Sequence, residues 1–190
     1  MSVVAAIFPG YPAPKRVVLP TGGGPYRRWP RPARLGTVKV HLLERSQRVT
    51  IPVDRAFAIY ADAANLEPMT PPWLHFRLTR RGPVTMEAGA LLHYTLRLHG
   101  VPIRWTTRIE TWSPPTGFVD TQASGPYALW EHTHAFEEDG DGGTVIHDRV
   151  RYALPLGPLG ALAHRGLVRR DVERIFDFRA RAVPALVTAR

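Results

Sequence analysis

Residues 128–137 read Ala-Leu-Trp-Glu-His-Thr-His-Ala-Phe-Glu, and this stretch alternates between two kinds of side chain. The ring-bearing side chains share the even positions, which hold Trp130, His132, His134 and Phe136. Successive side chains of a β-strand point to opposite faces of a sheet, so one face of this strand carries rings and the other is polar. The stretch therefore predicts a half-buried strand whose even face covers a core or a cavity.

Further strands are predicted on both sides of this one. They cover Thr37–Thr50, Leu74–Arg80, Ala90–His99, Ile103–Trp112, Gly117–Ala123 and Thr144–Leu154, and the strand with the rings covers Ala128–Glu137. Short turn signals such as Ser113-Pro114-Pro115 and Asp139-Gly140 separate the later strands. Strands joined by tight turns pair as neighbours, so we expect an antiparallel meander.

The same alternation predicts which side chains of the other strands point inward. The inward sets are Leu92, Tyr94, Leu96 and Leu98; then Ile103, Trp105, Thr107 and Ile109; and finally Ile146, Asp148, Val150 and Tyr152. The inward residues of the strand Ile103–Trp112 stand at odd positions, so Trp112 at an even position is predicted to point outward. A β-bulge would reverse the assignment for residues beyond it.

Two regions change from strand to helix periodicity. After Pro52, the spacing of Val53, Phe57 and Tyr60 predicts a short helix. Near the C-terminus, a long amphipathic helix is predicted over about residues 159–183, ending at Pro184. Its apolar stripe, expected to face the sheet, contains Leu167, Val172, Ile175 and Phe176. The result is an α+β fold: an antiparallel sheet wrapped around a long C-terminal helix, with two short helices after the first strand.

Several pieces of this chain match one known superfamily. The pieces are Trp112-Ser113-Pro114-Pro115, Phe118-Val119-Asp120, Gly125-Pro126-Tyr127, and the ring-bearing positions 130, 132, 134 and 136. Together they resemble the bacterial ligand-binding proteins of the START/SRPBCC (polyketide cyclase-like) superfamily, over residues 37–183. The resemblance implies the helix-grip fold and a central cavity for a lipid, polyketide or similar apolar molecule. Some members are cyclases or dehydratases.

The inward faces then predict the wall of this cavity. The expected ligand contacts are Tyr94, Trp105, Thr107, Trp130, His132, His134, Phe136 and Tyr152. The polar exceptions on the inward faces are the two histidines and Asp148, with Asp120 and Gln122 as further candidates. Buried ionisable groups need partners because desolvation is costly. Two readings stay open: these groups satisfy one another structurally, or they serve a ligand.

Two kinds of chemistry are compatible with these residues. His132 or His134 could act as general acid or base, with Asp148 orienting the imidazole, as a cyclase or dehydratase would need. Two histidines and a carboxylate could also form a facial triad for iron or zinc. A His-x-His pair is common by chance, and the resemblance implies no metal. We therefore expect no metal and no cofactor.

The charge of the chain is concentrated at one end. The net charge is +9, and residues 1–36 hold six basic and no acidic side chains. This stretch is also rich in proline and glycine, so we expect a basic tail over 1–36, disordered or irregular, and a ligand-binding domain over 37–190. Because the folded part is nearly balanced in charge, we expect no specific nucleic-acid partner.

The composition also bears on the compartment. The chain has no cysteine, which fits a reducing cytoplasm. It has no apolar run of about 18 residues, so no membrane span is expected. Met1 to Phe8 is apolar but lacks a basic leader, so we do not expect a signal peptide. The expected location is cytoplasmic, and the sequence carries no signal for a particular oligomeric state.

Three functions remain in competition. The first is a non-catalytic binding or carrier protein for a hydrophobic small molecule, which we expect. The second is a cyclase- or dehydratase-type enzyme that uses His132 or His134. The third is an adaptor whose basic tail touches a membrane or nucleic acid.

Removal of the tail tests the predicted domain boundary. A chain that begins at Gly36 should melt within about 3 °C of the full chain, because residues 1–36 carry no periodic apolar face that could pack on a core. Thermal unfolding followed by circular dichroism measures this. A much larger drop in melting temperature would mean that the tail is part of the folded domain.

Overall fold

The structure is a computed structural model that describes residues 39–79, 82, 84–155 and 164–188. The tail predicted over 1–36 lies outside the described residues.

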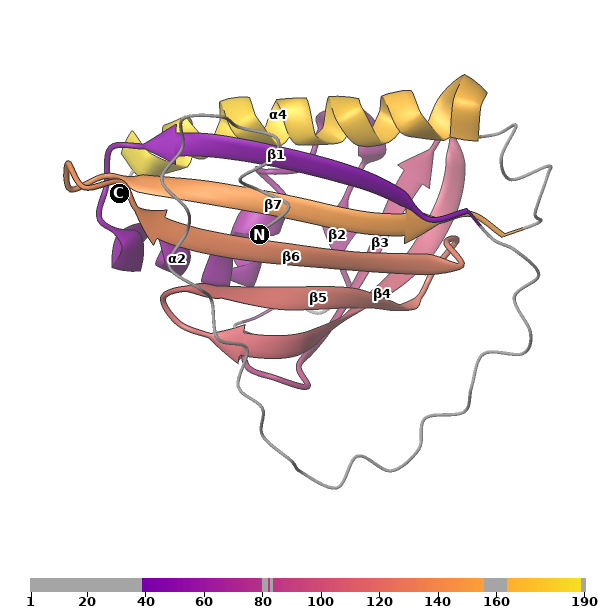
Figure 1. The fold of residues 1–190 in the computed structure, drawn as a ribbon. Helices are drawn as coiled ribbons and strands as arrows, with labels where there is room; N and C mark the ends of the chain where they lie inside the picture. The colour runs from indigo at the N-terminus through magenta and orange to yellow at the C-terminus, as the bar shows by residue number, and fades with distance from the viewer. Residues whose placement is uncertain (1–38, 80–81, 83, 156–163, 189–190) are drawn as a thin grey trace. The chain divides into compact units, whose positions relative to one another are not determined.

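The described chain is built on one seven-stranded antiparallel sheet (Figure 1). Its strands are β1 (His41–Val49), β2 (Arg77–Leu78), β3 (Leu91–Leu98), β4 (Val101–Ser113), β5 (Gly117–Ser124), β6 (Leu129–Glu138) and β7 (Thr144–Ala153). Their order across the sheet is β1-β7-β6-β5-β4-β3-β2. Each strand from β2 to β7 pairs with its neighbour in sequence, and β1 completes the sheet beside β7, so the predicted antiparallel meander is confirmed.

The strand predicted over Leu74–Arg80 is wrong in extent. Pro72–Leu74 forms a 3₁₀ helix, η2, and His75 caps it in the left-handed region at φ 45°. The strand β2 contains only Arg77 and Leu78, which pair with Thr95 and Tyr94 of β3. Proline fixes its own φ near −65° and suits the first turn of a helix, so the Pro71-Pro72 pair favours the helical turn.

The predicted inward faces are confirmed, with one informative exception in β4. Trp105, Thr107 and Ile109 are buried as expected. Between Ile109 and Thr111 the register with β5 shifts, so that Trp112 lies opposite Phe118 and its ring packs against the rings of Phe57 and Phe118. A bulge adds one residue to one strand and reverses parity beyond it. Trp112 is therefore part of the core and not outside it.

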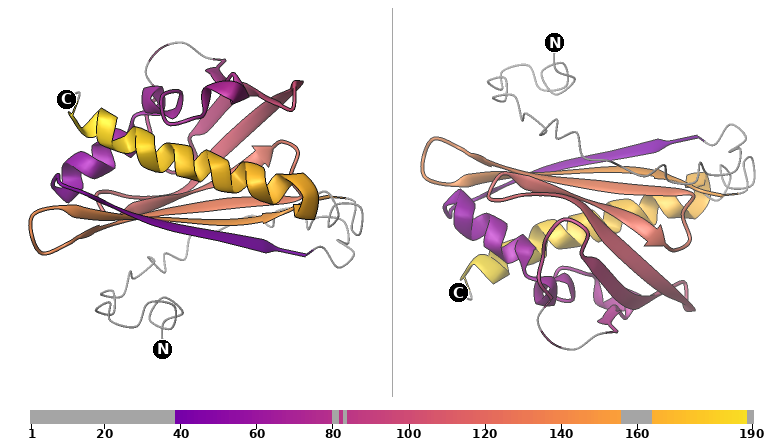
Figure 2. Two further views of the ribbon diagram at one scale, coloured as in Figure 1. Left: turned by 90° about the horizontal axis from the view of Figure 1, so that it is seen from above. Right: turned by 90° about the horizontal axis from the view of Figure 1, so that it is seen from below.

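Helices cover one face of the sheet (Figure 2). After β1, α2 (Val53–Ala61) buries Phe57, Ile59 and Tyr60, and the 3₁₀ helix η1 (Ala63–Leu66) follows it. A π-helical turn, η3 (His164–Val168), leads into the long helix α4 (Arg169–Thr188). None of these described helices is long and apolar enough to cross a membrane.

Pro184 does not end the last helix, which continues to Thr188. A proline inside a helix has no N–H to donate to the carbonyl four residues earlier, here that of Ala180. Gln47 of β1 supplies the missing partner: its Nε2 donates a hydrogen bond to Ala180 O at 2.9 Å. This hydrogen bond satisfies the Ala180 carbonyl, which Pro184 leaves without a backbone donor, so the helix continues past the proline.

Two clusters of buried side chains form the core. The first joins α2 to the sheet and to the end of α4, and includes Phe57, Phe118, Phe136, Ile146 and Val183. The second joins the earlier part of α4 to β1 and β7, and includes Leu43, Val150, Tyr152, Val172 and Phe176. Both clusters use the even faces of β6 and β7 that the sequence predicts.

One predicted core position is exposed. Leu167 was expected to face the sheet, but it lies in the π-helical turn and is 47% exposed. Trp73 is also exposed, at 43%, and it packs against Phe178, with the guanidinium of Arg174 4.9 Å from its ring centre. The π-helical turn widens the spacing, which moves Leu167 out of the stripe that Val172 and Phe176 follow.

Phe176→Ala tests how much α4 contributes to the core. Phe176 is 3% exposed, so truncation should lower the free energy of unfolding by roughly 3–5 kcal/mol. Urea unfolding measures the change. The matched control is Phe178→Ala on the same helix, where the ring is only half-buried and a smaller loss is expected. A loss below about 1 kcal/mol for Phe176→Ala would show that α4 does not close the core.

Candidate functional site

Strand register brings two histidines and two aspartates together on the helix-covered face of the sheet. His132 of β6 lies opposite Asp120 of β5, and His134 of β6 lies opposite Asp148 of β7. Residues directly opposite each other on paired strands point to the same face, and His132 and His134 are two positions apart, so all four side chains share one face. We call these four residues the His–Asp tetrad.

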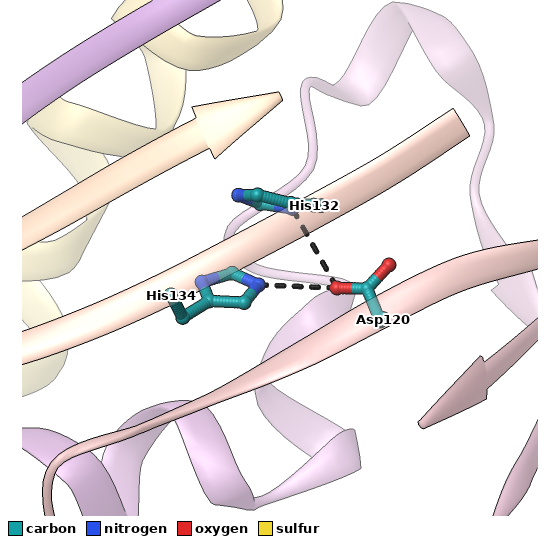
Figure 3. A group of neighbouring side chains, drawn as sticks. All are labelled: Asp120, His132 and His134. Atoms are coloured by element: carbon teal, nitrogen blue, oxygen red, sulfur yellow. Dashed lines mark hydrogen bonds and ion pairs between the residues drawn. The ribbon is translucent and has the colours of Figure 1, made fainter. Parts of the chain in front are cut away.

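The two hydrogen bonds of the tetrad run diagonally between the strands. His132 Nε2 lies 2.9 Å from Asp148 Oδ1, and His134 Nε2 lies 3.2 Å from Asp120 Oδ2. The other ring nitrogens are also near carboxylates: His132 Nδ1 is 3.6 Å from Asp120 Oδ2, and His134 Nδ1 is 3.0 Å from Asp148 Oδ1. Figure 3 shows both imidazoles converging on Asp120. Each histidine therefore faces both carboxylates.

Rings from both core clusters shield the tetrad from water. His132 and His134 are 4% and 5% exposed. Phe118 stacks on His134 with ring centres 4.2 Å apart, and Phe176 meets His132 edge-on at 5.2 Å. Interactions between charges are stronger in such a water-poor environment, so the protonation states of the four groups depend on one another.

The environment moves the pKa values of the two histidines in opposite directions. Burial, with the neighbouring His134 adding to it, lowers the pKa of His132 to about 4. Burial also acts to lower the pKa of His134, but the hydrogen bond with Asp120 and the close Asp148 carboxylate outweigh it, and the pKa of His134 is raised. Burial acts to raise the pKa of Asp148, but its two histidine partners outweigh this effect and lower the pKa. The two imidazoles of the tetrad therefore differ in how readily they take up a proton, His134 more readily than His132.

A cavity of about 150 Å³ adjoins the tetrad, between the sheet, η1, η2 and α4. Most of its wall is apolar, with Met69, Leu74, Leu92 and Ile175 among the lining residues. Asp120, His132 and His134 form part of the same wall. Small-molecule sites characteristically combine an apolar wall with a few convergent polar groups.

Six of the eight predicted ligand contacts line this cavity: Tyr94, Trp105, Thr107, Trp130, His132 and His134. The other two lie in the core clusters. Phe136 packs against the rings of Phe57 and Tyr60, and Tyr152 packs against Tyr127 and Trp130. Of the predicted polar candidates, Gln122 is occupied elsewhere, because its amide bonds to both backbone groups of Tyr127. That contact holds the turn between β5 and β6.

Sequence reasoning missed two polar residues of the wall, Tyr60 and Arg179. Both line the cavity, and Tyr60 Oη and Arg179 Nε are buried without a hydrogen-bond partner among the described residues. His134 Nδ1 is a third such atom, since its contact with Asp148 is not in line for a hydrogen bond. The sequence signal that could have identified Arg179 is its helical spacing. It follows Phe176 by three residues and therefore lies on the same face of the helix.

Three members of the tetrad have the donor set of a metal site. Asp120, His132 and His134 each offer one ligand atom, and these atoms lie within 4.8 Å of one another. Each of these three residues already has a hydrogen-bond or charge partner within the tetrad, so none of them needs a metal ion as a partner. The absence of a bound metal stays a prediction of the sequence analysis.

The tetrad also has the groups for proton transfer. A raised and a lowered pKa on adjacent imidazoles place a proton donor beside a proton acceptor. Asp148 is within hydrogen-bond distance of His132 and holds its ring orientation, as sequence reasoning expected of an orienting carboxylate.

The meander, the long C-terminal helix and the cavity between them define a helix-grip protein of the START/SRPBCC superfamily. A family model described as polyketide cyclase, dehydrase and lipid transport matches residues 40–188, and the chain belongs to this family. No curated protein matches the chain.

Solved structures agree on the fold. An aromatase/cyclase of a Streptomyces species is 16% identical, with a TM-score of 0.62, over 77% of this chain and 93% of that one. A norcoclaurine synthase of Thalictrum flavum is 14% identical, with a TM-score of 0.60, over 82% and 98%. A protein of Thermus thermophilus is 21% identical, with a TM-score of 0.55, over 77% and 99%. At these identities the likeness shows the fold alone.

The opposite pKa shifts predict a stability maximum near pH 6.5, the ordinary pKa of histidine. Between about pH 6.5 and 4, the unfolded chain binds a proton on His132 that the folded chain does not, so the free energy of unfolding falls as pH falls. Above pH 6.5, the unfolded chain loses the His134 proton first, so the free energy of unfolding falls as pH rises. Urea unfolding at a series of pH values measures both limbs.

Single substitutions separate the two limbs of this profile. His132→Gln should flatten the acid limb, and His134→Gln should flatten the alkaline limb. His93→Gln serves as the control, because His93 is exposed on the opposite face of the sheet, and it should change neither. An alkaline limb that survives in His134→Gln would refute the assignment of the proton to that residue.

Proposed function

We propose that this protein binds a small, mainly apolar molecule in the cavity between the sheet and α4, with the molecule's polar end toward the His–Asp tetrad. The observation that carries the proposal is the wall itself, which is apolar over most of its area and polar at one side. The proposed contacts are the six cavity-lining residues Tyr94, Trp105, Thr107, Trp130, His132 and His134. Family membership supports the proposal, since the superfamily binds hydrophobic small molecules.

The volume of the cavity limits the size of the molecule. A dry cavity of about 150 Å³ accommodates a molecule the size of benzene. The aromatic rings on one side of the cavity, Tyr94 and Trp105, lie nearly parallel at an interplanar angle of 15°. Flat rings offer large contact area, so a ligand built on a single ring fits this wall.

General acid–base catalysis on the bound molecule is a second candidate function. The observation that favours it is the pair of imidazoles with opposite pKa shifts, both on the cavity wall and both near carboxylates. In this function His134 would donate a proton and His132 would accept one, as a cyclase or dehydratase requires. Substitution of either histidine would then abolish turnover while binding survives.

Filling the cavity tests the binding function. Thr107→Trp should abolish the binding of ethylbenzene or 2-phenylethanol, because the larger side chain takes the space of the ligand. Isothermal titration calorimetry measures the affinity, and circular dichroism checks the fold. The matched control is Thr106→Trp, whose side chain lies on the opposite face of β4, beside His93. It should bind both probes within about twofold of the unaltered protein.

A second pair of variants covers the case in which Thr107→Trp does not fold, since Thr107 Oγ1 bonds to Tyr94 and Trp105. Ala63 lines the cavity and its neighbour Ala64 is exposed. Ala63→Leu should weaken probe binding, and Ala64→Leu should not. Equal binding in both members of either folded pair would overturn the cavity as the binding site.

A further inference from the structure

Arg179 is a cation in the apolar cavity without a counter-ion among the described residues. It extends from α4 into the wall, with its guanidinium carbon 5.1 Å from the centre of the Phe176 ring. Its Nε is buried and makes no hydrogen bond with any described group. Asp120 and Asp148 form their hydrogen bonds with the histidines of the tetrad, and no described carboxylate forms an ion pair with Arg179. The Arg179 side chain is half-buried with its Nε fully buried, and a cation desolvated in this way without a counter-ion is stabilised by an anion.

Tyr60 adds a second unpaired donor to the same wall. Its ring packs edge-on against His134 at 5.6 Å, and its buried hydroxyl has no hydrogen-bond partner among the described residues. Burial and the Asp148 charge raise the pKa of Tyr60, and the Arg179 charge opposes them, so the phenol stays a neutral donor. Tyr60 and Arg179 line the same cavity.

We propose that the ligand of this cavity is a small monocyclic carboxylic acid, whose carboxylate accepts hydrogen bonds from Arg179 Nε–H and Tyr60 Oη–H. This inference rests on the proposed binding function and names the class of ligand. Arginine cannot accept a hydrogen bond, and its planar donors match the geometry of a carboxylate. A neutral ligand would leave the guanidinium without a counter-charge.

The rest of the cavity agrees with a ring attached to that carboxylate. The volume of about 150 Å³ suits one ring with a short side chain. The stacked Tyr94 and Trp105 rings give the apolar part a flat contact surface. The carboxylate of the ligand would give Arg179 the counter-charge that no described side chain provides within ion-pair distance.

Three probes of one skeleton test the proposal on the full chain. They are phenylacetate, 2-phenylethanol and ethylbenzene, which share a ring and differ in the terminal group. Isothermal titration at pH 7 should show phenylacetate binding about tenfold or more tighter than 2-phenylethanol, because hydrogen bonds to charged groups are the stronger ones.

Substitutions assign the effect to Arg179. Arg179→Met should weaken phenylacetate binding by about tenfold or more and leave ethylbenzene binding within about twofold. Tyr60→Phe should weaken phenylacetate binding by a smaller factor. The matched control is Arg181→Met, which removes an exposed arginine two residues further along α4 and should change neither affinity.

The outcomes separate this proposal from the binding function. If ethylbenzene and 2-phenylethanol bind but phenylacetate binds no tighter, the carboxylate proposal fails and the binding function stands. The same conclusion follows if Arg179→Met folds and leaves phenylacetate affinity unchanged. If none of the three probes binds, the binding function fails and the proposal fails with it. If Arg179→Met does not fold, the order of the three affinities in the unaltered protein decides.

Discussion

The desolvation of four ionisable side chains is the constraint on which the centre of this structure depends. Two imidazoles and two carboxylates lie under Phe118 and Phe176, where each would be costly alone. They are tolerated because β5, β6 and β7 pair in the one register that sets each histidine opposite one aspartate and diagonal to the other. A slip of any of these strands would leave a buried charge without a partner, so the tetrad selects the register while the register builds the tetrad.

Alternation and helical spacing predict much of this fold, because they report which face of an element is buried. The even face of residues 128–137, the burial of Trp105 and Thr107, and the stripe of Val172 and Phe176 follow directly from those periods. The family resemblance adds the order in which the elements assemble. What these patterns leave open is set by contacts between distant segments, such as the bulge in β4 that turns Trp112 into the core.

The candidate site shows the same division. The alternation of side chains predicts that His132, His134 and Asp148 point inward. It does not predict which imidazole meets which carboxylate, because that depends on the strand register. Helical spacing puts Arg179 on the stripe of α4, yet an arginine on a stripe is more often a flanking surface residue. Its importance emerges only with the cavity wall and the lack of a described counter-ion beside it. Pro184 is a similar case, since Gln47, far away in sequence, allows the helix to continue.

The two core clusters and the cavity wall share side chains. Tyr60 and Phe118 of the first cluster and Phe176 of the second also line the cavity. A substitution at one of these shared positions would alter ligand binding and the stability of the fold together. Wall positions outside both clusters, such as Thr70 and Leu98, carry less of that double burden. Changes of ligand preference are therefore expected to accumulate first at such positions, while the shared aromatic residues stay constant.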